Sequence, residues 1–178
     1  MSHEQNQTFR IRPLEPDDAD ALHALTLANR EHLAPWDPHR PEYFFTRDGR
    51  QEHLSAQLAR HRTGHEYPYV MTLGGRLVGQ ITLSNVVRGP LQSANVGYWI
   101  DREHQGRGLT SQALRSIVDL ARDDFGLHRL EAGTMLENVA SQRVLTSCGF
   151  EEYGVAPKFL KIAGSWQDHR LYQRILHD

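Results

Sequence analysis

The sequence has few of the features that mark secreted or nucleic-acid-binding proteins. Its 178 residues contain a single cysteine, Cys148, so no internal disulfide can form, which agrees with a reducing compartment. Cys148 precedes a glycine at a predicted helix end and reads as a buried, inert thiol. The formal net charge is −2 and the basic residues are scattered along the chain. A nucleic-acid surface gathers Lys and Arg on one face, so we expect no direct DNA binding.

Long apolar runs are also absent. No stretch approaches the roughly 20 apolar residues that cross a bilayer, and Met1 to Thr8 are polar, unlike an export signal. We therefore expect no membrane association and a cytoplasmic location. His61 and His65 have metal-like spacing, but Gly64 interrupts the helix that would align them, so we expect no metal.

The composition that remains is typical of a folded globular protein. Apolar residues make up 39% of the chain and charged residues 24%. The length fits one domain, which we place at 1–178 with a core of about 9–176. We expect a monomer or a homodimer.

Hydrophobic periodicity predicts an α/β (α+β) domain with a mixed sheet, because strands come first in hairpins and are later separated by helices. The segment 34–48 is rich in proline and aromatic residues and is expected to be an irregular loop lining a pocket. The predicted strands are 9–11, 69–73, 77–83, 94–100 and 129–134, followed by two more around the turn at 163–164. One predicted helix begins near Pro16, and three more cover 51–61, 111–125 and 139–148.

A glycine turn joins the buried strand 94–100 to the strongest amphipathic helix, 111–125. Gly106 and Gly108 lie in this turn, and such a junction directs several backbone N–H groups and the positive end of the helix dipole at one point. A pyrophosphate would fit there. Arg107, between the glycines, adds a charge-assisted contact.

Two other phosphate-binding motifs do not match this turn. A nucleoside-triphosphate loop needs lysine and then Ser or Thr after the second glycine, but Leu109 and Thr110 follow it. A dinucleotide fingerprint needs glycine or alanine at Ser111 and an acidic residue at the end of the next strand, whereas Glu131 lies near the start of that strand. Taken alone, the turn is equally consistent with a helix cap that binds nothing.

Two spaced motifs distinguish these possibilities. The run from Gln105 to Thr110 resembles motif A of the GCN5-related N-acetyltransferase (GNAT) superfamily, Q/R-x-x-G-x-G/A, with Thr110 departing from its last small residue. Downstream, Asn138, Ser141 and the Gly149-Phe150 pair resemble motif B. The stretches 30–36, 84–89 and 166–169 are similar to the RimJ/RimL type of ribosomal-protein-alanine N-acetyltransferase, so the resemblance covers nearly the whole chain.

This resemblance implies a GNAT-type fold, a mixed, mostly antiparallel and twisted sheet that is splayed in the middle, flanked by helices and holds acetyl-CoA in the splay. Asn138 would contact the pantetheine arm near the thioester. Three strand residues would hold the arm through their backbone: Tyr98, Trp99 and Ile100. The glycine turn and the first helical residues would hold the pyrophosphate: Gly106, Arg107, Gly108, Leu109, Thr110 and Ser111.

The catalytic residues are less evident. The tyrosine that protonates the thiolate in many relatives is replaced by Leu145, and the RimL-like pattern offers Ser141 instead, near Asn138. Ser141 equally suits a residue that satisfies a free N–H in the first helical turn. The glutamate base of some relatives is replaced by Gly133. Asp168, His169 and His39 remain candidates, while Glu131 is expected to be too deeply buried.

The sequence therefore predicts an acetyl-CoA-dependent N-acetyltransferase that acts by direct attack in a ternary complex. The acceptor we expect is a protein α-amine, such as that of a ribosomal protein. An α-amine with a pKa of about 7.7 to 8 is about a fifth or more neutral near pH 7.4, so it needs little help from a base; a lysine near 10.4 is about one part in a thousand neutral. The alternatives are acetylation of a small-molecule amine, an antibiotic or a metabolite, and a non-catalytic acetyl-CoA-binding module.

Overall fold

The computed structural model describes residues 8–178. The first seven residues, on which part of the expectation of no export signal rests, lie outside this range. The strands are β1 (Phe9–Pro13), β2 (Tyr67–Leu73), β3 (Arg76–Val87), β4 (Ser93–Ile100), β5 (Arg129–Met135), β6 (Glu151–Ile162) and β7 (Ser165–Ile175). The helices are α1 (Ala19–Ala28), α2 (Arg30–Leu33), α3 (Arg47–Arg62), α4 (Leu109–Asp123) and α5 (Val139–Ser147), with short 3-10 turns η1 (Pro16–Asp18), η2 (Glu42–Phe45) and η3 (Arg102–His104).

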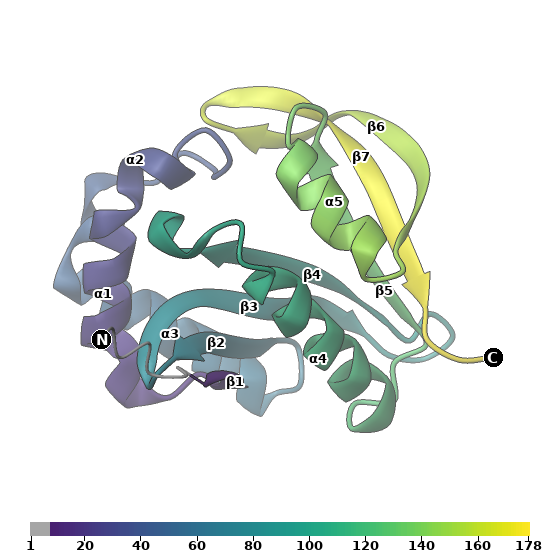
Figure 1. Cartoon of the computed structure of the whole chain (residues 1–178), viewed down its shortest axis with the longest axis horizontal. Coiled ribbons are helices and arrows are strands. Elements are labelled where there is room, and N and C mark those ends of the chain that lie inside the picture. The colour runs from purple at the N-terminus through teal and green to yellow at the C-terminus, as the bar shows by residue number, and fades with distance from the viewer. Residues whose placement is uncertain (1–7) are drawn as a thin grey trace, which may run out of the picture.

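Within residues 8–178 the strands form one seven-stranded sheet in the order β1-β2-β3-β4-β5-β7-β6, in which only the β4–β5 pair is parallel. This pair is short: Ser93–Asn95 is joined to Arg129–Glu131, and beyond these residues the two strands part (Figure 1). The sheet is therefore splayed in its middle, as expected. The two halves flank an opening at the ends of β4 and β5.

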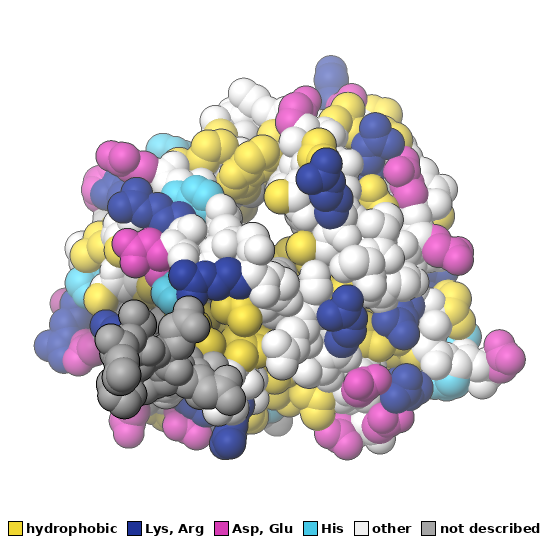
Figure 2. Space-filling view, viewed as in Figure 1, with side chains coloured by type: hydrophobic (Ala, Val, Ile, Leu, Met, Phe, Trp, Pro, Cys, Tyr) yellow, Lys and Arg dark blue, Asp and Glu magenta, His cyan; other side chains and the backbone are white. Residues whose placement is uncertain are grey.

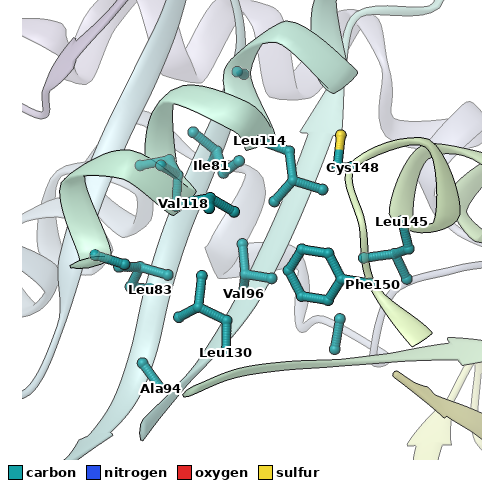
Figure 3. Close-up of a cluster of buried hydrophobic side chains, with 14 of the residues drawn as sticks. Ile81, Leu83, Ala94, Val96, Leu114, Val118, Leu130, Leu145, Cys148 and Phe150 are labelled. Atoms are coloured by element: carbon teal, nitrogen blue, oxygen red, sulfur yellow. The ribbon is translucent and has the colours of Figure 1, made fainter. Parts of the chain in front are cut away.

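Helices cover the sheet on both faces. Helix α4 packs on one face, where its Leu114 and Val118 lie over Ile81 and Val96, and Phe150 extends this core toward α5 (Figure 3). On the other face, a smaller core joins α1, α3, β2 and β4: Leu22, Leu54, Val70 and Trp99 pack together there. The larger core fixes α4, and with it the glycine turn, relative to β4.

Some elements begin earlier than their sequence patterns predict. Helix α3 starts at Arg47, because the Thr46 hydroxyl oxygen caps it by accepting from the Gly49 N–H at 3.1 Å. Helix α4 starts at Leu109, directly after Gly108. The segment 34–48 is irregular apart from α3's first residues and η2, as predicted. Among residues 8–178, no helix combines the length and apolar character needed to cross a bilayer.

Candidate active site

The glycine turn has the shape of an anion site. Gly106 and Gly108 have φ angles of 71° and 73°, in the left-handed region that a side chain disfavours. A Cβ built on either glycine would meet nothing within 4 Å, so the backbone there borders open space. Within the described residues, the N–H groups of Gly106, Arg107 and Gly108 have no hydrogen-bond partner. These donors are available to a bound anion.

Helix α4 adds further donors beside the turn. Leu109, Thr110 and Ser111 form its first turn, where N–H groups have no partner within the helix. No acidic residue lies in that turn, and the exposed Arg107 precedes it, so the local field favours negative charge. The residues predicted to hold the pyrophosphate are thus brought together at one helix end.

Asn29, which no sequence motif singles out, anchors this region. The side chain is fully buried at the end of α1. Its Nδ2 donates to Asp101 Oδ1 at 3.0 Å, and its Oδ1 accepts from the Arg102 N–H at 2.9 Å. A pattern typical of helix ends could have suggested a cap, but not a bond to a residue 72 positions away. Asn29 ties α1 to the end of β4, just before the glycine turn.

The backbone of β4 supplies one wall of the splay. The Asp101 N–H donates to Val78 O of the neighbouring β3 at 2.7 Å. Because hydrogen-bonding groups alternate along a strand, the N–H and C=O groups of Ile100 and Tyr98 point to the opposite edge, toward β5. Those of Trp99 point to β3. Tyr98 and Ile100 thus present backbone groups to the opening, as a pantetheine arm requires.

Two residues of the predicted catalytic site lie at the start of α5. Asn138 caps the helix, since its Oδ1 accepts from the Ser141 N–H at 3.1 Å. The Ser141 hydroxyl lies 2.9 Å from the hydroxyl of Tyr98 on β4, so a hydrogen bond crosses from one side of the splay to the other. Burial raises the pKa of Tyr98, although the bond to Ser141 opposes this shift, so Tyr98 stays protonated at neutral pH.

A buried hydroxyl on β5 lacks a partner within the described residues. Thr134 is only 4% exposed, and its Oγ1 has no hydrogen-bond partner in the described part of the chain. Even-numbered residues of β5 face α4 and α5, because Ala132 belongs to the core formed with those helices. Thr134 therefore lies on the same side of the sheet as Ser141. Unsatisfied buried polar groups are costly, and a ligand with amide groups, such as pantetheine, would satisfy this one.

The candidates for the base have different surroundings. Glu131 is half-buried rather than deeply buried, and its Oε1 accepts from the Arg129 guanidinium at 3.1 Å and from the Tyr153 hydroxyl at 2.9 Å. Asp168 is exposed and accepts from the Lys158 N–H at 2.8 Å, which is a turn contact. Of the two histidine candidates, His39 is exposed and His169 is buried.

The molecule is hollowed beside the splay. Figure 2 shows a central hollow between the elements that Figure 1 labels α2 and α5, with hydrophobic side chains at its rim. The loop after α2 and the β6–β7 turn meet beside it, since the Ala163 N–H donates to Asp37 O at 3.0 Å. This contact bridges the two halves of the molecule. Among residues 8–178, no group of three His, Cys, Asp or Glu side chains is arranged to hold a metal ion, and Cys148 is buried.

Comparisons with known proteins agree with this arrangement. Residues 8–151 match the family model described as "Acetyltransferase (GNAT) domain". The chain is 36% identical to the probable N-acetyltransferase YjcK of Bacillus subtilis over 169 residues, covering 94% of this chain and 93% of the relative. It is 32% identical to the [ribosomal protein uS5]-alanine N-acetyltransferase of Escherichia coli over 163 residues, covering 90% and 84%.

A solved structure extends the likeness to the cosubstrate. Mycobacterium smegmatis RimJ in complex with CoA-disulfide superposes with a TM-score of 0.90 at 34% identity, covering 94% of this chain and 81% of that one. The family match, the splay and the unpartnered donors lead to the same conclusion. The chain belongs to the GNAT family, is similar to the RimJ/RimL ribosomal-protein alanine N-acetyltransferases, and is an acetyl-CoA-dependent N-acetyltransferase.

Proposed function

We propose that the enzyme acetylates the N-terminal α-amine of a protein, with a ribosomal protein as the acceptor class. The observation that carries this proposal is the hollow beside the splay, which the Asp37–Ala163 contact bounds on one side. A bounded passage admits a chain end more readily than a segment from the middle of a folded surface. A ribosomal acceptor also places the enzyme in the cytoplasm.

The relatives support the same acceptor class. The Escherichia coli relative is named for alanine acetylation of ribosomal protein uS5, and the chain covers most of its length. The chemistry is consistent, because an α-amine with a pKa of about 7.7 to 8 is partly neutral at cellular pH, whereas a lysine amine near 10.4 is almost fully protonated.

We assign the roles of the site residues within this proposal. The thioester of acetyl-CoA supplies the activated acetyl group. The turn Gly106–Gly108 and the first residues of α4 hold the pyrophosphate, and backbone groups of β4 and Asn138 hold the arm. The Ile100 N–H polarises the acetyl carbonyl, and the Ser141 hydroxyl protonates the departing thiolate.

The test is thiol release from acetyl-CoA with peptides beginning with Ala or Ser, compared with N-terminally blocked peptides that carry lysine. Release with the free N-termini alone is expected. Release with the blocked lysine peptides at an equal rate would contradict the proposal. Release with neither, while acetyl-CoA binds, would instead indicate a small-molecule amine as acceptor.

A further inference from the structure

The middle of β5 lacks a side chain on the face away from α4 and α5, because Gly133 lies there. Gly133 is exposed there and offers no side chain of its own. A Cβ built on it would lie 3.6 Å from Cδ2 of His169 and 3.7 Å from Cε1 of Phe159, which are ordinary contacts. The His169 side chain therefore lies beside Gly133, although it belongs to β7. The topology places β7 directly beside β5.

The surroundings of His169 fix which ring nitrogen carries its proton. The side chain is 3% exposed, and its Nδ1 lies 3.0 Å from the carbonyl oxygen of Gln167. A carbonyl oxygen can only accept, so Nδ1 donates, and in the neutral ring Nε2 holds a lone pair. Among the described residues, Nε2 has no hydrogen-bond partner. His169 is thus oriented as a proton acceptor.

His169 and Ser141 lie on opposite faces at the same end of β5. His169 pairs with Met135, the last residue of β5, and the Asn138 N–H donates back to Met135 O at 3.0 Å, which leads directly into α5. Odd-numbered residues of β5 face away from α4 and α5, as does His169. Ser141, on α5, lies on the other face. Ser141 and His169 therefore flank the end of β5 from its two faces.

The acidic residues near His169 are held by other contacts, so they are not free to accept a proton from the amine. Glu131 shares its face of the sheet, but its carboxylate is held by Arg129 and Tyr153. Asp168, the preceding residue on β7, points to the opposite face and accepts from Lys158. From β6, the ring of Phe159 packs against the imidazole with centroids 5.6 Å apart, which supports the ring without competing for a proton.

We propose that His169 is the general base of the reaction, resting on the α-amine acceptor proposed above. Nε2 takes one proton from the acceptor's ammonium group, which becomes a neutral amine while the imidazole becomes cationic. The amine nitrogen then forms a bond to the acetyl carbon, the carbon–sulfur bond breaks, and the thiolate takes a proton from Ser141. The new amide nitrogen then releases its extra proton to solvent. Solvent also takes the proton from His169 and returns a proton to Ser141.

The test compares two acceptors in the variant His169→Gln. General bases typically contribute about 100-fold or more, so kcat/KM for an Ala-initiated peptide should fall by about that factor. A peptide of the same sequence that begins with an aminooxyacetyl group has a nucleophile already neutral at pH 7, and its kcat/KM should change less than about threefold. The exposed variant His65→Gln serves as the matched control and should leave both acceptors unaffected.

A rescue experiment separates catalysis from structure. Adding Gly133→Glu to His169→Gln places a carboxylate beside position 169 and should restore part of the lost activity on the Ala-initiated peptide. Equal loss on both acceptors, or no loss on either, would overturn the proposal. If the wild-type enzyme acetylates no α-amine, the proposed function fails first, whatever the variants show.

A measurement on the unaltered enzyme does not depend on the variant folding. Long-range proton–nitrogen NMR spectra should show His169 as the neutral tautomer with hydrogen on Nδ1 at pH 8. Hydrogen on Nε2 instead would remove the lone pair that the proposal needs and would refute it.

Discussion

The hydroxyl of Tyr98 on β4 lies 2.9 Å from that of Ser141 on α5 and links the two sides of the splay. The Tyr98 hydroxyl also lies 3.3 Å from the Ser141 carbonyl oxygen. When Tyr98 donates to Ser141 Oγ, the Ser141 proton is free to reach the thiolate. Tyr98 therefore positions the proton donor of the proposed reaction.

The variant Tyr98→Phe should reduce kcat about tenfold, because Ser141 loses the contact that orients its hydroxyl. Ser141→Ala should cost at least as much, and the double variant no more than Ser141→Ala alone, since both residues act through one proton. Steady-state kinetics with an Ala-initiated peptide measure this, with Tyr69→Phe as the control. Losses that multiply in the double variant would show that the two residues act independently.

We expect two glycines with equal backbone strain to differ in their effect on acetyl-CoA binding. Gly108 and Gly89 have φ angles of 73° and 71°, and a Cβ on either meets nothing within 4 Å. Replacement by Ala should lower the free energy of unfolding by about 1–2 kcal/mol in both cases. Only Gly108→Ala should weaken acetyl-CoA binding, because only that turn is proposed to hold the pyrophosphate. Urea unfolding and calorimetric titration test the pair; equal affinities would remove the turn from the binding site.

Thr134→Val should affect stability and binding in opposite directions. Removing an unpartnered buried hydroxyl leaves the free energy of unfolding of the free protein unchanged or higher. The Kd for acetyl-CoA should rise about two- to tenfold, the equivalent of one hydrogen bond. Thr26 on α1 also carries a buried, unpartnered Oγ1, so Thr26→Val is the matched control and should leave the Kd unchanged. An unchanged Kd in Thr134→Val would mean that the hydroxyl does not contact the ligand.

We expect His53 to lower the free energy of unfolding in mild acid. Burial first, and then the positive charges of Arg50 and Arg40, lower its pKa to about 4. The unfolded chain takes up this proton near pH 6.5, before the folded chain does, so the free energy of unfolding falls as pH decreases from about 6.5 to 4. Because His53 is partly exposed, screening limits its contribution to about 1–2 kcal/mol.

Urea unfolding of the wild type and of His53→Gln over this range checks the sign. The variant should lose most of this slope, whereas His65→Gln, at an exposed position, should keep it. A slope that survives in His53→Gln would assign the acid sensitivity to other groups.

Local patterns determined much of this protein. The apolar spacing on α4 and the alternation of β1 require no distant partner, because each reflects the period of its own backbone. The glycine turn follows equally from local chemistry, since Gly106 and Gly108 adopt positive φ angles that other residues avoid. These features were enough to predict the mixed sheet and to propose where an anion binds.

The contacts that define the chemistry were decided by the tertiary structure. Tyr98 meets Ser141 across 43 positions, and Asn29 meets Asp101 across 72. His169 lies beside Gly133 only because β7 lies between β5 and β6 in the sheet. Strand order and side-chain contact at such separations depend on how the whole core packs, and no local period encodes them. The sequence alone predicted where the cosubstrate binds; the fold decided which side chains surround the proposed site.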